Sequence, residues 1–147
     1  MLIDPDTLPF RELVDAAPDG IVVTGQQGTI LLVNAEAVRM FGYASNELVG
    51  KPIHLLVPER LRAMHPDHVK NFHDAPRLRP MGSGLDLFGR RSDGTEFPVE
   101  ISLSPIQHGG QRLVVAGIRD VTDRRKIERE AKRANAYLIS AVDAIQD

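Results

Sequence analysis

Hydrophobic and polar residues alternate most regularly between positions 97 and 104. Every odd position there is Phe, Val, Ile or Leu, and every even position is Pro, Glu or Ser. Successive side chains of a strand point to opposite faces, so this pattern predicts a half-buried antiparallel strand. Asp93-Gly94 supplies the positive φ of a tight turn, and residues 85–88 form the partner strand. The sequence therefore predicts a β-hairpin here.

Three further apolar runs predict the rest of a sheet. Residues 21–24 and 29–33 are rich in β-branched side chains and flank a turn that begins and ends with glycine. Residues 113–118 form an apolar run short enough to be a central strand. The chain thus carries five predicted strands, arranged as two hairpins plus one.

Helical patterns precede and separate these strands. Residues 8–17 place apolar side chains at helical spacing. Asn34 is a favourable N-cap for a helix over residues 35–41, and a second short helix follows at residues 45–48. A longer helical pattern runs from residue 59 to about residue 73. Together the elements predict an α+β fold.

A change in composition marks the last part of the chain. No glycine or proline occurs from Thr122 to Asp147, which predicts one long helix. Its apolar residues recur with the 3.5-residue period of a coiled-coil seam, at Ile127, Ala131, Ala134, Leu138, Ala141 and Ile145. This seam predicts a homodimer through the C-terminal helix. The alternative is a helix that packs its apolar stripe on its own sheet.

Length, charge and cysteine content narrow the class of protein. The chain has 147 residues, a formal net charge of −2 and no cysteine. This length fits one domain plus an extension, and the charge gives no bulk attraction to nucleic acid or anionic lipid. No apolar run approaches bilayer length, and no signal peptide is visible. We therefore expect a cytoplasmic protein with no nucleic-acid partner and no membrane segment in this stretch.

The chain divides into three predicted segments. Residues 1–6 are an N-terminal tail, residues 7–121 are the domain, and residues 122–147 are a coiled-coil-type linker helix. Residues 14–19 (VDAAPD) and 142–147 (VDAIQD) resemble each other. If this is a repeat, the linker helix leads into a second domain of the same kind, and a chance match of six positions is the alternative.

Six short motifs, in order, resemble the PAS sensory-domain family. They span nearly all of residues 7–125 and comprise Pro18-Asp19-Gly20-Ile21, Asn34-Ala35-Glu36-Ala37, Phe41-Gly42-Tyr43, and residues 47–51, 91–100 and 118–124. The resemblance implies a five-stranded antiparallel sheet with helices on one face, a small-molecule pocket between them, and a C-terminal helix that relays a signal. It also implies that Asp120 and Thr122 form the hinge where the sheet meets that helix.

A pocket between sheet and helices has a predicted apolar lining. The residues expected there are Ile21, Val23, Met40, Leu56, Val69, Phe72, Leu85, Leu87, Val99, Ile101, Val115 and Gly117. Such a surface suits a fatty acid or an aromatic metabolite, and plain core packing is the alternative.

His65 is the candidate ligand of a haem iron. On a helical count it shares one face with Leu61 and Val69, and a neutral imidazole in an apolar pocket can bind haem iron axially. Residues 64–69 are similar to the helix of haem-containing PAS oxygen sensors that carries this histidine. Those sensors tend to place arginine or methionine on the opposite wall, where this chain has Leu85. The alternative is a histidine hydrogen-bonded in the domain wall.

Other chemistries are disfavoured. A zinc or nickel site at His65, His68 and His73 competes with a solvent-facing polar stripe, which the pattern favours. Flavin-cysteinyl photochemistry requires a cysteine. No nucleophile elbow or phosphate-cradling glycine loop is present, so we expect no enzyme activity.

The resemblance to PAS domains, taken with the predicted helix seam, implies a sensor and dimerisation module of a larger signal-transduction protein. A small ligand binds in the pocket, and its state is relayed through the C-terminal helix to a linked effector. The alternatives are a haem-based gas or redox sensor with His65 as axial ligand, and a ligand-free scaffold for protein interaction and dimerisation.

Overall fold

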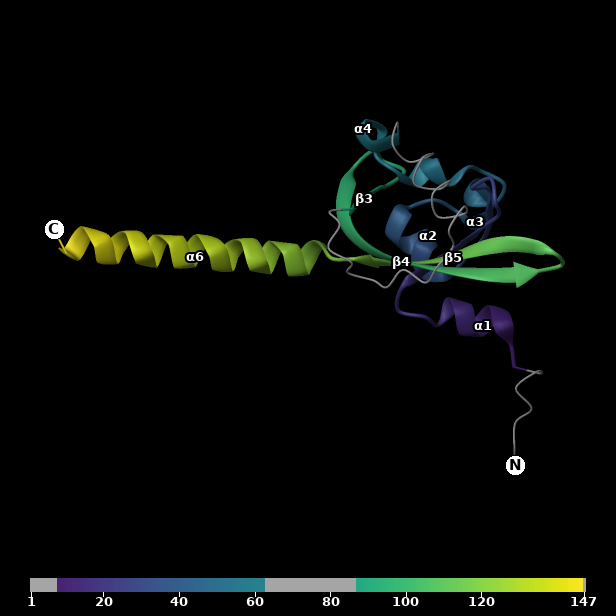
Figure 1. The fold of residues 1–147 in the computed structure, drawn as a ribbon, viewed down its shortest axis with the longest axis horizontal. Coiled ribbons are helices and arrows are strands. Elements are labelled where there is room, and N and C mark those ends of the chain that lie inside the picture. The colour runs from purple at the N-terminus through teal and green to yellow at the C-terminus, as the bar shows by residue number, and fades with distance from the viewer. Residues whose placement is uncertain (1–7, 63–86, 147) are drawn as a thin grey trace, which may run out of the picture.

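The computed structural model describes residues 8–62 and 87–146 (Figure 1). In chain order its elements are α1 (Phe10–Asp15), β1 (Gly20–Thr24), β2 (Ile30–Val33), α2 (Ala35–Phe41), α3 (Ser45–Leu48), the 3-10 helix η2 (Ile53–Leu56), α4 (Glu59–Arg62), β3 (Leu87–Arg90), β4 (Glu96–His108), β5 (Gln111–Asp120) and α6 (Thr122–Gln146). The predicted N-terminal helix is shorter than expected. The predicted helix over residues 59–73 is described only as far as Arg62.

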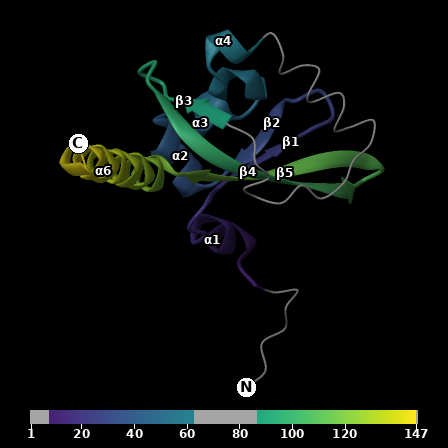
Figure 2. The same ribbon diagram turned by 60° about the vertical axis from the view of Figure 1, so that its left-hand side comes forward.

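The five strands form one antiparallel sheet. Its order is β2-β1-β5-β4-β3, so β5 lies at the centre as its continuous apolar run predicts. α2, α3, η2 and α4 lie on one side of the sheet, and α1 lies on the other (Figures 1 and 2). The predicted α+β fold with five antiparallel strands is confirmed.

β4 and β5 are longer than the alternation pattern indicates. Pro105 does not end β4, because it pairs with Val114 and the ladder continues to His108 and Gln111. In the described part of the chain β3 pairs with β4 over residues 96–99, so no described strand lies beside Pro105 on the side away from β5. A proline there therefore costs no ladder hydrogen bond to any described strand.

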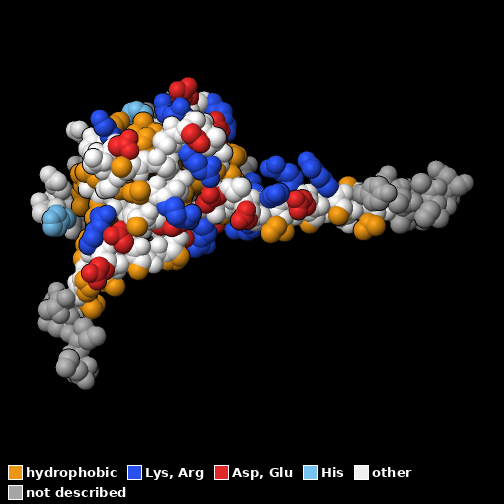
Figure 3. Space-filling view, turned by 180° about the vertical axis from the view of Figure 1, so that it is seen from behind, with side chains coloured by type: hydrophobic (Ala, Val, Ile, Leu, Met, Phe, Trp, Pro, Cys, Tyr) orange, Lys and Arg blue, Asp and Glu red, His pale blue; other side chains and the backbone are white. Residues whose placement is uncertain are grey.

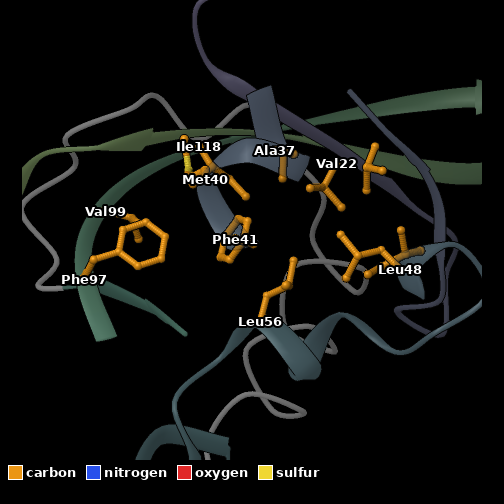
Figure 4. Close-up of a cluster of buried hydrophobic side chains, with 12 residues drawn as sticks. Val22, Ala37, Met40, Phe41, Leu48, Leu56, Phe97, Val99 and Ile118 are labelled. Carbon is orange, nitrogen blue, oxygen red and sulfur yellow. The ribbon is translucent and has the colours of Figure 1, made fainter. Parts of the chain in front are cut away.

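The hydrophobic core lies between the sheet and the helices on one of its faces (Figure 4). The ring of Phe41 on α2 meets that of Phe97 on β4 edge-on, with 5.3 Å between centroids. Gly89 on β3 passes directly beside both rings, and a Cβ there would lie 2.9 Å from an atom of each. The core therefore requires glycine at this position.

The strand register corrects the predicted position of Val115. It pairs with Val23 and Ser104, whereas its neighbour Ala116 pairs with the buried Val22 and with Leu103. Val115 therefore lies on the sheet face opposite the core, together with Ile21, Val23 and Gly117. An uninterrupted apolar run carries no period of two, so the sequence alone could not assign its two faces.

α6 projects away from the domain as an extended arm (Figures 1 and 2). Its 25 residues span about 37 Å at the usual helical rise. The side chains of Ile127 and Leu138 are 65% and 62% exposed. The alternative in which this stripe packs on its own sheet is therefore wrong for these two residues. Among the described elements, α6 included, none has the length and apolar character that a membrane-crossing helix needs.

Candidate functional site

The end of β5 and the start of α6 meet at the carboxylate of Asp120. Its Oδ1 accepts hydrogen bonds from the backbone N–H of Thr122, at 2.9 Å, and from the Thr122 hydroxyl. Its Oδ2 accepts from Nη2 of Arg91, which lies in the turn between β3 and β4, at 3.2 Å. The two hinge residues predicted from the sequence are thus in contact, and one carboxylate joins the first turn of α6 to the β3–β4 turn.

Arg91 connects this junction to the hydrophobic core. Its guanidinium carbon lies 4.0 Å from the centroid of the Phe97 ring, a cation–π contact. Phe97 is buried and stacks edge-on against Phe41. Ser92 fixes the same turn, because its N–H donates to the Phe41 carbonyl and its hydroxyl donates to the Gly42 carbonyl, both at 2.8 Å. Contacts therefore run without a break from α2 to the start of α6.

Two further ion pairs hold the junction. Arg124 in the first turn of α6 donates to the carboxylate of Glu100 on β4, and this hydrogen bond lowers the pKa of Glu100. Arg119 at the end of β5 donates to both oxygens of Asp19, at 3.1 and 3.2 Å. That pairing raises the pKa of the Arg119 guanidinium. α6 is therefore held to the sheet by the Arg124–Glu100 ion pair as well as by the continuous backbone.

A polar hollow of about 440 Å³ opens at this junction. It is lined by three arginines and three carboxylates, with Met40 and others: Glu36, Arg39, Arg91, Arg119, Asp120 and Asp123. This hollow is not the predicted apolar pocket. Its walls come from α2, the β3–β4 turn, β5 and α6, so its shape depends on how α6 leaves the sheet.

The predicted pocket residues divide into three groups. Met40, Leu56 and Val99 are buried in the core, and Leu87 and Ile101 are half-buried and pack against it. Val115 lies on the opposite face of the sheet, together with Ile21, Val23 and Gly117. The remaining candidates, including the haem-ligand candidate, lie outside the described residues: His65, Val69, Phe72 and Leu85.

Arg62 at the end of α4 has an unusual environment that the sequence did not reveal. Its Nε donates to the Val57 carbonyl at 2.9 Å, which fixes the guanidinium beside the end of η2. Its Nη2 is buried and has no hydrogen-bond partner among the residues that the structure describes. Arg60, two residues earlier, donates to Glu96 at 2.8 Å and lies over the ring of Phe88. Arg60 is therefore paired with a carboxylate, whereas Arg62 has a buried N–H without a partner in the described part of the chain.

The predicted dimer seam follows one side of α6. Hydrophobic side chains gather along one side of the helix, and lysine and arginine side chains gather along the other (Figure 3). Ile127, Ala131, Ala134 and Leu138 are all exposed. Ala141 and Ile145 lie within the helix, but their side chains are outside what the structure describes. The seam is thus present as an uncovered stripe, and the homodimer stays a prediction.

Residues 9–121 match the family model of the PAS fold. The chain belongs to the PAS family. Among curated proteins, sensor protein FixL of Bradyrhizobium diazoefficiens is 27% identical over 130 residues, which cover 88% of this chain and 26% of FixL. Oxygen sensor protein DosP of Escherichia coli is 27% identical over 124 residues, covering 84% of this chain and 15% of DosP. The PAS chain therefore spans about a quarter of FixL and less of DosP.

Solved structures show the same fold. The PAS domain of an HTR-like protein from Haloarcula marismortui superposes with a TM-score of 0.63 at 23% identity, covering 76% of this chain and 88% of that one. An RNA-binding light-oxygen-voltage receptor superposes with a TM-score of 0.72 at 20% identity, covering 92% of this chain and 39% of that one. At these identities the likeness concerns the fold. The fold is that of PAS domains, and the two curated relatives named above are sensor proteins.

Proposed function

We propose that this PAS domain binds a small ligand between its sheet and helices and relays the ligand's presence through α6 to a linked effector. The observation that carries the proposal is the Asp120 carboxylate, which caps α6 with one oxygen and pairs with Arg91 with the other. A ligand that binds one arrangement of the sheet better than another shifts the population between them. Through Phe97 and Arg91, such a shift reaches the first turn of α6. The module is regulatory rather than catalytic.

The relay can be tested by hydrogen exchange at the amides of the first turns of α6. We expect ligand addition to change their protection in the wild type, and this change to fall at least several-fold in Arg91→Gln. Arg112→Gln, at the far end of β5, serves as the control and should keep the wild-type response. An unaltered response in Arg91→Gln would refute this route. Native mass spectrometry of the purified protein shows whether a ligand is retained at all.

A haem-based sensor is the second candidate function. It is supported by the relatives FixL and DosP, of which DosP is named an oxygen sensor, and by His65 in the motif described above. The described residues fit a haem in one respect, because the buried Nη2 of Arg62 lacks the partner that a propionate would supply. When bound, haem iron supplies a site for a diatomic gas. In that case His65 would hold the iron and Arg62 a propionate.

Spectroscopy separates the two candidates. Protein expressed with a haem supply should show a Soret band that His65→Ala abolishes or shifts. His68→Ala, a histidine of the same predicted helix, should leave the band unchanged. No Soret band, or one that His65→Ala does not alter, would remove the haem candidate and leave a haem-free ligand or a ligand-free scaffold.

A further inference from the structure

The Arg62 side chain is 29% exposed, but one nitrogen of its guanidinium is buried and has no hydrogen-bond partner in the described part of the chain. Nε is used by the Val57 carbonyl. Nη1 lies 3.9 Å from the Glu59 carboxylate, beyond hydrogen-bond distance, and the Glu59 side chain is 76% exposed. Nη2 is shielded from solvent and has no partner in the described part of the chain. Burying an N–H donor without an acceptor is costly, so an unpaired donor of this kind points to a missing acceptor.

The position of this donor indicates where the acceptor would lie. α4 follows η2, which places the buried Leu56 in the core, and Pro58 between them is also fully buried. On α4, Glu59 and Arg60 are exposed, while Leu61 and Arg62 are turned inward and half-buried. α4 stands on the same side of the sheet as the core (Figures 1 and 2). The free N–H of Arg62 is therefore on the helix-covered side, at the border of the apolar interior.

We infer that Arg62 binds the carboxylate of an apolar ligand held on this side of the sheet. The Arg62 guanidinium is already held in place through Nε, and its Nη2 has an N–H left to donate. It can therefore bind a carboxylate with little loss of side-chain freedom. The apolar body of the ligand then contacts core side chains, and its charged end is neutralised at the rim. This inference rests on the proposed ligand-binding function. Two sources supply this chemistry, a fatty acid and the propionates of haem.

The experiment compares each acid with its ester, because the ester keeps the apolar body and removes the charge. Dodecanoic acid and methyl dodecanoate form one arm, measured by native mass spectrometry. Haemin and its dimethyl ester form the other, measured by Soret titration. Each is tested on the full chain of the wild type, Arg62→Met and Arg60→Met. Arg60→Met removes the same charge from the same helix at an arginine that is already paired.

In at least one arm the wild type should bind the acid about 10- to 100-fold more tightly than the ester, the size expected of a charge-assisted hydrogen bond in a sheltered site. Arg62→Met should abolish this preference and leave the affinity for the ester unchanged, whereas Arg60→Met should retain it. The arm that responds identifies the source. A preference for acid that survives Arg62→Met, or equal binding of acid and ester to the wild type, overturns the role of Arg62. If the wild type binds none of the four probes, both this inference and ligand sensing of this class fail.

Discussion

Asn34 shows how much of this fold rests on one polar side chain. It is completely buried, and its Oδ1 accepts from Ala37 N at 3.0 Å and from Ile21 N at 2.7 Å. Its Nδ2 donates to the carbonyls of Val14 and Asp19, at 2.8 and 3.0 Å. One amide thus caps α2 and ties it to α1 and to the start of β1. The sequence predicted that Asn34 caps α2. It could not predict the hydrogen bonds to Val14, Asp19 and Ile21, because these depend on how α1 and β1 pack against α2.

Replacing Asn34 by alanine should lower the free energy of unfolding by about 2–4 kcal/mol. Loss of the cap costs about 1 kcal/mol, and the buried backbone groups left without partners add the rest. Urea unfolding followed by circular dichroism measures the effect. Asn46→Ala, an exposed asparagine in α3, is the matched control and should change stability by less than about 0.5 kcal/mol. If both variants lose the same free energy of unfolding, the four hydrogen bonds of Asn34 do not stabilise the fold as described.

Gly89→Ala should destabilise the protein by about 1–3 kcal/mol, the usual cost of overpacking a well-packed core. The added methyl would lie 2.9 Å from ring atoms of both Phe41 and Phe97. The same change at Gly25 meets only one atom of Leu31, at 3.9 Å, and should be nearly neutral. Thermal unfolding of the two variants tests the contrast. If Gly89→Ala is as stable as Gly25→Ala, the aromatic pair is not packed as described.

At the scale of elements, what the sequence could predict depends on whether a periodic signal exists. The alternation in residues 97–104 assigned the core face of β4 correctly, since Phe97 and Val99 are buried. The run in β5 is apolar on both faces, so Val115 was assigned to the wrong one. Arg91 belongs to one of the motifs that resemble the PAS family, but its contact with the Phe97 ring and its ion pair with Asp120 join segments far apart in sequence. Such contacts become visible only once the register is fixed.

The attachment of α6 to the sheet should weaken in acid. The hydrogen bond from Arg124 lowers the folded-state pKa of Glu100 below its ordinary value of 4.5. A carboxyl with a lowered folded pKa contributes stability above its unfolded pKa, and the contribution is lost as pH falls through the folded value. Exchange protection of the first turn of α6 should therefore hold at pH 6 and decline below about pH 4.5.

Two variants separate this effect from general acid sensitivity. Glu100→Gln should show low protection at pH 6 already and little further change on acidification. Glu130→Gln alters a carboxylate on the same helix and should keep the wild-type pH profile. If Glu100→Gln retains the full acid-induced loss, another carboxylate is responsible.

At the scale of the whole molecule, the helical arm α6 leaves the domain at a junction that contacts the core through Arg91 and Phe97. The uncovered apolar stripe of α6 is the surface that a second copy would bury, and the basic side of the helix would then stay in solvent (Figure 3). In a parallel pair, the Asp120 caps of both copies would stand at the base of the seam. A change at either cap would alter helix rotation or register in both arms, which is the kind of transition that signalling helices can transmit.

This arrangement predicts a dimer that depends on the seam. The protein should sediment at about twice its monomer mass of 16.2 kDa at micromolar concentration. Ile127→Glu should weaken association at least tenfold, because a charge would be buried where the helices meet. Arg129 lies two residues after Ile127, which puts it on the opposite side of α6 at about 100° per residue, so Arg129→Glu should leave the mass unchanged. A wild type that remains monomeric, or a dimer that tolerates Ile127→Glu as well as Arg129→Glu, would mean that the apolar stripe serves a different contact. The relay would then have to act through a single arm.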